Sequence, residues 1–500
     1  MVASFPWDSR QQRLLATPVA SSNDRMSTAS ISRRLSRWVA GLAYSDLPAE
    51  VRDRACGVTL QGLSSCLLGR DFPETIQAIR LVEEEEPGCG GTTTVLVDGR
   101  RFTRAGAAFI NSEMMFAGGK WDTFRMVVHP SCAILPAALM AAEATRCSGS
   151  EFLTGVVAGY EVTERLAADF VPTIMARGFH AGPVFSIFGA AVAVAKIMGL
   201  DAEQVHGTLA QCVNLAAGNL EGGRSGGRSV REGAAVRNAL LAVGLARQGI
   251  PGGETVFEGE AGFYFAYAGN REGRLSHSFA GKRTADFAAI TAKLGEDWMF
   301  LEILYRIYST AGYNIAHVDV TAALCQRDHI RPENVDRVEC VVNWLETQYP
   351  SPAFPSRRTD TDPAREQPQY YAAHAILTGS FPITKNVQQQ VGEADPQGID
   401  DMMRRVRLIP SHTQPLFAPR VTIHTRDGIA HTLESTGREF IMSFDDGKKA
   451  VADRRRGPRR RTAVCGPGCR MSADRSCGRR SEIDCTDLPP DRPIVSGQSN

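Results

Sequence analysis

The fold of much of the surrounding chain can be inferred from residues 121–143, WDTFRMVVHPSCAILPAALMAAE. The stretch begins with polar and charged residues, passes through His129-Pro130-Ser131 and continues as an apolar helical pattern. Proline disfavours helical backbone in the residue before it, so His129 is expected on an extended segment. Ser131 is expected to be the N-cap of a helix that begins at about Cys132. A histidine just outside a buried helix N-terminus is well placed to receive a carboxylate. The alternative, a loop histidine that bonds only to local backbone groups, stays open.

Helical patterns fill the chain on both sides of this stretch. Three follow one another within residues 31–86, and a short hairpin with an Asp-Gly turn is expected at residues 92–103. The later apolar helical segments lie at residues 105–116, 132–144, 151–170, 184–198, 202–216 and 233–247. Helices that are apolar on nearly every side are expected in the middle of a large helical domain. The small residues of the run 188–195 (FGAAVAVA) should let two helices approach closely.

The pattern changes after about residue 276. Residues 335–345 alternate as a strand does, and residues 420–433 predict a second hairpin around an Asp-Gly turn. A helix is expected at residues 369–377, after a proline-rich loop. This mixture of strands and a helix is typical of a smaller α+β domain.

The fold class that these patterns predict is mainly α, in four parts. A large all-helical domain spans residues 31–276, and a smaller α+β domain spans residues 277–445. Residues 1–30 are polar and irregular, and we expect a disordered arm there. Residues 446–500 form an atypical basic tail with four cysteines, also expected to be disordered. A zinc site in this tail is the weaker alternative, because its cysteines lack paired spacing and histidine partners.

Composition narrows the classes of function. The chain has 500 residues, of which 43% are hydrophobic, enough for a sizeable core. Its 56 Lys and Arg residues balance 55 Asp and Glu residues, which argues against a nucleic-acid partner and against a membrane surface. No window approaches the ~18 uninterrupted apolar residues of a membrane span. The scattered cysteines predict reduced thiols and a cytoplasmic location, with a mitochondrial one as the alternative.

A second histidine, His180, repeats the arrangement at His129, because it stands directly before an apolar helix. Two histidines placed in this way could serve as a general acid and a general base near neutral pH. Two unrelated loop histidines are the alternative.

Residues 218–233, GNLEGGRSGGRSVREG, form a glycine-rich stretch that is not a phosphate-binding loop. No strand precedes it, and it has neither the lysine nor the glycine spacing of such loops. Its Arg224, Arg228 and Arg231 suit carboxylate recognition, with a solvated surface loop as the alternative. The sequence also lacks the HExxH and GxSxG motifs and the cysteine signature of an iron–sulfur hydro-lyase, so we expect no metal and no organic cofactor.

Several separated stretches between about residues 31 and 440 resemble, in the right order, the MmgE/PrpD family. They are His129-Pro130-Ser131 with Ile134-Leu135-Pro136, Phe179-His180 before Gly189-Ala190-Ala191, residues 196–200 (KIMGL), residues 260–263 (EAGF), Tyr349 with Phe354-Pro355, and Ala364-Arg365 before Gln369-Tyr370. The family includes 2-methylcitrate dehydratase and cis-aconitate decarboxylase. The resemblance implies a helical domain with a smaller lid domain, usually as a homodimer, and a metal-free active site between the two domains.

Carried over residue by residue, the resemblance places the two family histidines on His129 and His180. It places the family threonine on Thr123, its acidic neighbour on Asp122 and a lid tyrosine on Tyr349.

Two departures from the family pattern affect the site. Two family lysines fall on Arg228 and Arg306, which keep the charge but cannot readily give up a proton. Gly119-Lys120-Trp121 stands where the family usually has an acidic cluster, so one carboxylate is missing there.

The resemblance therefore implies a cofactor-free lyase for a small tricarboxylate, and dehydration of 2-methylcitrate or a longer alkylcitrate is the leading interpretation. His129 and His180 would move the protons, with Asp122 and Tyr349 assisting. The residues expected to bind substrate are Thr123, Arg228, Arg231 and Arg306. A cis-aconitate-type decarboxylase is the alternative within enzymes, and a catalytically inactive scaffold of the same fold is the alternative outside them.

Overall fold

The computed structural model describes residues 29–88, 90–222, 230–306, 312–348, 368–380 and 395–437. Three of the candidate residues, Arg224, Arg228 and Tyr349, lie outside this part of the chain, as do residues 1–28 and the predicted tail at residues 446–500.

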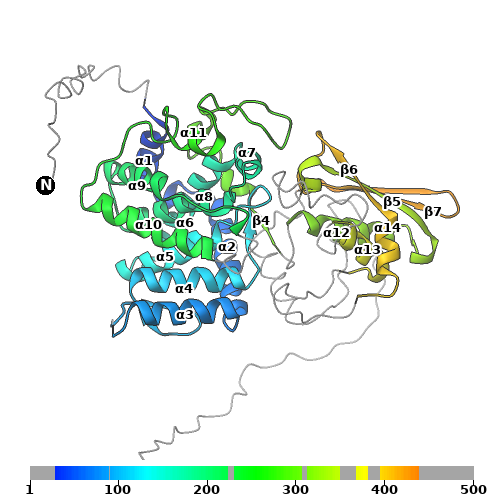
Figure 1. The fold of residues 1–500 in the computed structure, drawn as a ribbon, viewed down its shortest axis with the longest axis horizontal. Helices are drawn as coiled ribbons and strands as arrows, with labels where there is room; N and C mark the ends of the chain where they lie inside the picture. Colours follow the sequence, from blue (N-terminus) through cyan, green and yellow to red (C-terminus); the bar gives the residue numbers. More distant parts are fainter. Residues whose placement is uncertain are drawn as a thin grey trace, which may run out of the picture. The chain divides into compact units, whose positions relative to one another are not determined.

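The first part of the described chain is helical, as the sequence predicted (Figure 1). Its helices are α1 (Ile31–Gly41), α2 (Ala49–Gly69), α3 (Pro73–Glu85), α4 (Arg104–Ala117), α5 (Ser131–Thr145), α6 (Gly149–Ala167), α7 (Val171–Ala176), α8 (Ala181–Ile197), α9 (Ala202–Leu215), α10 (Val230–Arg247) and α11 (Phe263–Ala268). The short hairpin expected near its start is formed by β1 (Thr93–Thr94) and β2 (Arg101–Phe102).

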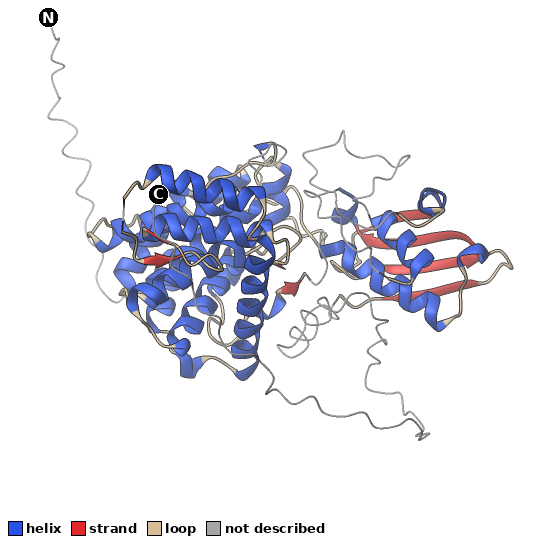
Figure 2. Cartoon of the chain, turned by 90° about the horizontal axis from the view of Figure 1, so that it is seen from below, coloured by secondary structure: helices blue, strands red, loops and turns tan. Residues whose placement is uncertain are grey.

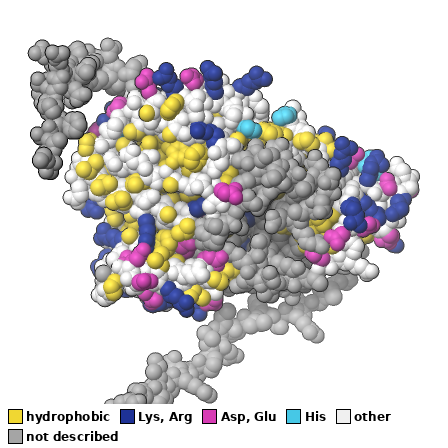
Figure 3. All heavy atoms as spheres, viewed as in Figure 1, with side chains coloured by type: hydrophobic (Ala, Val, Ile, Leu, Met, Phe, Trp, Pro, Cys, Tyr) yellow, Lys and Arg dark blue, Asp and Glu magenta, His cyan; other side chains and the backbone are white. Residues whose placement is uncertain are grey.

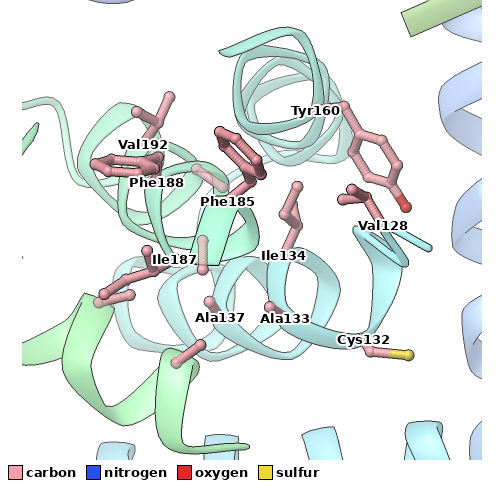
Figure 4. Close-up of a cluster of buried hydrophobic side chains, with 14 of the residues drawn as sticks. Val128, Cys132, Ala133, Ile134, Ala137, Tyr160, Phe185, Ile187, Phe188 and Val192 are labelled. Carbon is pink, nitrogen blue, oxygen red and sulfur yellow. The ribbon is translucent and has the colours of Figure 1, made fainter. Parts of the chain in front are cut away.

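Helices α5, α6 and α8 pack at the centre of this part, and their crossing depends on small residues. A Cβ atom on Gly159 of α6 would lie 2.5 Å from the carbonyl oxygen of Gly189 on α8, and the reverse distance is the same. Real Cβ atoms do not come this close to backbone, so glycine is needed at both positions for space. Ile134 of α5 fills the room that remains, with its side chain directed between the two other helices (Figure 4). The close approach expected from the run 188–195 is confirmed.

The first turn of α5 differs from the prediction. Ser131 is the first helical residue, and Pro130 is the N-cap, with φ −60° and ψ −35°. The hydroxyl group of Ser131 donates a hydrogen bond to Oδ1 of Asp122 at 2.8 Å and makes no capping bond. The prediction of Ser131 as N-cap is wrong because a partner from another segment binds its side chain.

The second part is a four-stranded sheet with helices on one face (Figure 2). Its strands are β5 (Val335–Asn343), β6 (Val406–Ser411), β7 (Arg420–Thr425) and β8 (Ala430–Glu434), in the order β6-β5-β7-β8. Strands β7 and β8 form the predicted hairpin, whereas β6 runs parallel to β5. The covering helices are α12 (Gly312–Arg327), α13 (Pro368–Thr378) and α14 (Ile399–Arg405). The predicted fold class, mainly α with a smaller α+β part, is confirmed; the exact domain boundaries stay predictions.

The surface of the described residues carries both signs of charge. On the face drawn in Figure 3, Lys and Arg side chains are interspersed with Asp and Glu side chains, and hydrophobic side chains gather over the helical part. This mixture agrees with the net charge of +1. Among the helices that the structure describes, none combines the length and the hydropathy that crossing a membrane requires.

Candidate active site

Two short strands hold the segment before α5 against a distant part of the chain. Strand β3 (Asp122–Thr123) pairs antiparallel with β4 (Leu304–Tyr305). Just beyond β4, the backbone N–H of Arg306 donates to the carbonyl oxygen of Trp121 at 3.1 Å. The guanidinium of Arg306 also lies 4.3 Å from the centre of the Trp121 ring. Arg306 is far from the segment of His129 in the sequence, and these contacts hold its positive charge beside that segment.

Asp122 lies fully buried beneath this strand pair. Its Oδ1 accepts hydrogen bonds from the backbone N–H and the hydroxyl group of Ser131, at 3.2 Å and 2.8 Å, and its Oδ2 accepts from the hydroxyl group of Tyr160 on α6. Burial raises the pKa of Asp122 to about 6, although these hydrogen bonds oppose the shift. The carboxyl group therefore ties β3 to α5 and α6. The assisting role predicted for Asp122 stays a prediction.

The segment that leads to His129 is a tight turn. Phe124 and Val128 form a pair of backbone hydrogen bonds, at 2.8 Å and 3.2 Å, across Arg125 and Met126. These two residues have φ values of 49° and 59°, which are unusual for side chains of their size. Such backbone costs on the order of 1–3 kcal/mol per residue and tends to persist at functional sites.

His129 is oriented by the strand it follows. Its Nδ1 lies 3.0 Å from the carbonyl oxygen of Asp122 and 3.3 Å from Oγ1 of Thr123. A carbonyl oxygen can only accept, so Nδ1 carries the hydrogen and Nε2 of the neutral ring carries the lone pair. The ring packs on Trp121, with ring centres 4.6 Å apart. His129 is 8% exposed, so it is sheltered but still reaches the surface.

His180 is held in the opposite tautomer. It is the N-cap of α8, and its Nδ1 accepts a hydrogen bond from the backbone N–H of Gly182 at 3.1 Å. Its own backbone N–H donates to the carbonyl oxygen of Gly218 at 3.2 Å. Because Nδ1 accepts, Nε2 of the neutral ring carries the hydrogen. These hydrogen bonds thus leave His129 able to accept a proton and His180 able to donate one. Acid–base catalysis needs one group of each kind.

Two buried carboxyl groups near these helix ends were not predicted. Glu232 in the first turn of α10 is fully buried, and Glu113 of α4 is 3% exposed. Glu232 interacts electrostatically with Glu113 and with Asp122, so the start of α10 lies in the same region as β3. The feature of the sequence that could have revealed such a group is a single acidic residue within a largely apolar helical segment, as at Glu113 in residues 105–116. That pattern alone does not say what the carboxyl group meets.

The other predicted residues fall as follows. Thr123 is fully buried beside His129, and Arg231 lies next to Glu232 in the first turn of α10. Arg231 lowers the pKa of Glu232, against the larger effect of burial. Gly119 has φ +71°, a left-handed conformation that favours glycine. The structure thus brings Asp122, Thr123, His129 and Arg306 together through the β3–β4 pair. It places His180 and Arg231 near Glu232.

A metal site is a separate question. Within the described ranges, the His, Cys, Asp and Glu side chains form no group of three or more that could hold a metal ion. The expectation of a metal-free reaction stays a prediction, with its test below.

Comparisons with known proteins agree on one family. Residues 33–276 match the model of the MmgE/PrpD N-terminal domain. The chain is similar to the "Cis-aconitate decarboxylase-like protein oryM" of Aspergillus oryzae, with 28% identity over 56% of this chain and 59% of that protein. It is also similar to the cis-aconitate decarboxylases of Aspergillus terreus and Mus musculus. The first is 23% identical over 82% of this chain and 86% of its own length, and the second is 25% identical over 66% of each chain.

The aligned part of the chain thus spans less than two thirds of the length of the first of these relatives. The residues that match the family model include the helical domain that carries His129 and His180. Residues 33–276 of the chain thus form an MmgE/PrpD N-terminal domain.

Proposed function

We propose that this protein is a lyase for a citrate-like tricarboxylic acid and that it catalyses a decarboxylation of the cis-aconitate type. The observation that carries the proposal is the hydrogen bonding of His180, whose Nδ1 accepts from the backbone N–H of Gly182 so that Nε2 of the neutral ring carries a hydrogen. An N–H group oriented in this way suits the donation of a proton to carbon. The family and the printed activities of the relatives support the substrate class and the choice of decarboxylation.

In the decarboxylation, the bond between carbon and the departing carboxylate breaks and its electron pair moves into the carbon chain. The carbon that receives this electron pair takes a proton, and the N–H of His180 is the acid that supplies it. Arg306 is the described cation best placed to hold a remaining carboxylate, because its guanidinium is already oriented on Trp121. His129, when protonated, adds a second cation for the same purpose.

A dehydration of 2-methylcitrate or a longer alkylcitrate is the second candidate, and one observation favours it. Loss of water needs a base for the carbon-bound hydrogen as well as an acid for the leaving hydroxide. The lone pair of His129 and the N–H of His180 match those two requirements. The two reactions differ in what His129 must be, a cation in decarboxylation and a neutral base in dehydration.

The test is to dialyse purified protein against EDTA, incubate it with cis-aconitate, citrate and 2-methylcitrate, and identify the products by mass spectrometry. We expect loss of carbon dioxide from cis-aconitate at an unchanged rate after dialysis. Loss of water from 2-methylcitrate would select the second candidate, and no reaction with any of the three acids would support an inactive scaffold. A rate that collapses on dialysis and returns with added metal would contradict the metal-free prediction.

The role of Arg306 gives a second prediction. Replacing it with lysine keeps the charge but removes the planar group that stacks on Trp121 and can bind a carboxylate through two hydrogen bonds. Losing one charge-assisted hydrogen bond costs on the order of 1.5–3 kcal/mol, or roughly ten- to a hundredfold in affinity. In steady-state kinetics, Arg306→Lys should therefore raise KM by that factor and leave kcat nearly unchanged.

A matched control is Arg237→Lys. The guanidinium of Arg237 also lies 4.3 Å from an aromatic ring centre, that of Phe109, but it pairs with Glu85 near the surface. This variant should change neither constant. If Arg306→Lys instead increases kcat, the position needs a proton donor and the carboxylate-binding role is wrong.

A further inference from the structure

Glu232 is a buried carboxyl group that the function described so far does not use. It is fully buried, and neither of its oxygens has a hydrogen-bond partner among the described residues. A buried polar group without a partner costs free energy, so such a residue is expected to serve some purpose other than stability.

The position of Glu232 relative to His180 indicates that purpose. Oε1 of Glu232 lies 2.7 Å, and Nδ1 of His180 lies 3.0 Å, from the point that a Cβ atom on Gly182 would occupy. The two atoms are therefore no more than about 6 Å apart, within the range in which charges shift a pKa and one water can relay a proton. The backbone of Gly182 is not in the left-handed region. Glycine is needed at position 182 for space, and a Cβ atom there would be too close to both the carboxyl group and the imidazole.

The charges around Glu232 favour a protonated carboxyl group that can still ionise. The pKa of Glu232 is raised to about 7, mainly by burial; Arg231 on its own helix opposes this shift, and Glu113 from α4 and Asp122 from β3 contribute to it. The thiol of Cys132 on α5 also faces it, with its own pKa raised by burial. Helix α9, which packs on α10 as well, contributes none of the described groups that shift Glu232.

We propose that Glu232 is a positioning residue that exchanges a proton with Nδ1 of His180 and thereby allows His180 to act as an acid. This inference rests on the proposed role of His180 as proton donor. A neutral imidazole that gives away its Nε2 hydrogen would become an anion unless Nδ1 gains one. In the proposed step Nδ1 gives up the hydrogen bond that it accepts from Gly182, and the O–H bond of Glu232 breaks as an N–H bond forms at Nδ1 by way of one water. At the same time the Nε2–H bond breaks as the C–H bond of the product forms. The negative charge of the departed carboxylate is then on Glu232, and a proton from water restores the starting state.

The variant Glu232→Gln tests this step, because it keeps the shape of the side chain and removes its ionisation. We expect kcat to fall by about ten- to a hundredfold, with KM changed less than about twofold. The limb of the pH–rate profile near pH 7 should disappear. The melting temperature should stay equal or rise, because no ionisable group remains buried. A purely structural role predicts the reverse, a lower melting temperature with an unchanged pH profile.

Glu113→Gln is the matched control. It also removes one buried carboxyl group, but it leaves Glu232 in place and takes away a negative neighbour. The pH–rate limb should therefore persist and move to lower pH, since ionisation of Glu232 becomes easier. Loss of the limb in this variant, or its persistence in Glu232→Gln, would overturn the proposal.

A measurement without substrate separates this inference from the proposed function. In a histidine-labelled sample, the NMR signal of His180 is identified by its absence in His180→Asn and followed through a pH titration. Glutamine at position 232 cannot form the anion that Glu232 forms when it ionises, so the His180 titration should move to lower pH in Glu232→Gln. An unmoved titration contradicts the proton exchange even if the enzyme is active. A moved titration in a protein that converts no tricarboxylate contradicts only the proposed function.

Discussion

Replacing either His129 or His180 with asparagine is expected to lower kcat by roughly 10²–10⁴-fold, the usual contribution of a general acid or base. Asparagine is the informative choice because it places a polar atom near the position of Nδ1. At position 180 it is also one of the best N-cap residues, so α8 should keep its first turn. The loss of activity is then not a loss of fold. The measurement is steady-state turnover of the tricarboxylate that the wild type consumes, together with the melting temperature.

His329→Asn is the control for this pair. His329 is exposed beyond the end of α12 and has φ +54°, a conformation that asparagine tolerates. We expect it to keep full turnover. If His129→Asn and His180→Asn also keep it, both histidines are structural and the proposed mechanism is wrong.

The pH dependence of the wild type distinguishes the two candidate reactions. If His129 binds a carboxylate as a cation, kcat/KM should fall as the imidazole loses its proton. If His129 is the base of a dehydration, kcat/KM should rise over the same interval. His129→Asn should abolish whichever limb is found.

The second large effect concerns stability, and it comes from Asp122. Its pKa is about 6 in the folded protein, against 3.8 for an unperturbed aspartate. Between these values the folded state binds more protons than the unfolded state, so stability falls as the pH rises from about 4 to about 6 and is constant above. A folded-state pKa that lies about two above the unfolded one corresponds to about 3 kcal/mol of stability. Asp122→Asn cannot ionise, and its amide oxygen still accepts from Ser131, so it should gain up to about 3 kcal/mol over the wild type at pH 7.

Chemical denaturation of both proteins at several pH values measures this difference. At pH 4 the two free energies of unfolding should nearly coincide, and the gap should open by pH 6. Asp98→Asn should change the free energy of unfolding in the opposite direction. Arg100 lowers the pKa of this more exposed carboxyl group, so above that pKa the wild type should be more stable than the asparagine variant. An Asp122→Asn variant that is less stable than wild type at pH 7 would contradict the prediction. If it is stable but loses 10²-fold or more in kcat, Asp122 takes part in the chemistry itself.

Gly119 stands where the family resemblance implies an acidic cluster. Its φ of +71° favours glycine, and aspartate is among the side chains that tolerate this region best. Glu232 offers a different source of acid at the other histidine. The chain thus has a buried carboxyl group in the site region, on α10 and not on the segment before β3.

The sequence by itself determined the helical domain, the two hairpins and the positions of His129 and His180. These depend on local patterns, because the spacing of apolar residues fixes which face of a helix is buried, and an Asp-Gly turn fixes where a hairpin reverses. The small residues of 188–195 likewise predicted the close crossing of α6 and α8. Even where the family resemblance supplied roles, it did so through short motifs that are contiguous in the chain.

Only the tertiary structure decided which side chains these positions meet. Ser131 looked like an N-cap, but Asp122 takes its hydroxyl group. Parallel pairing of β6 with β5, the stacking of Arg306 on Trp121 and the approach of Glu232 to His180 each join segments far apart in sequence. The spacing of apolar residues predicts that a residue is buried, but it does not predict which side chains surround it. The protonation of a buried group depends on the charges and hydrogen bonds of those surrounding side chains.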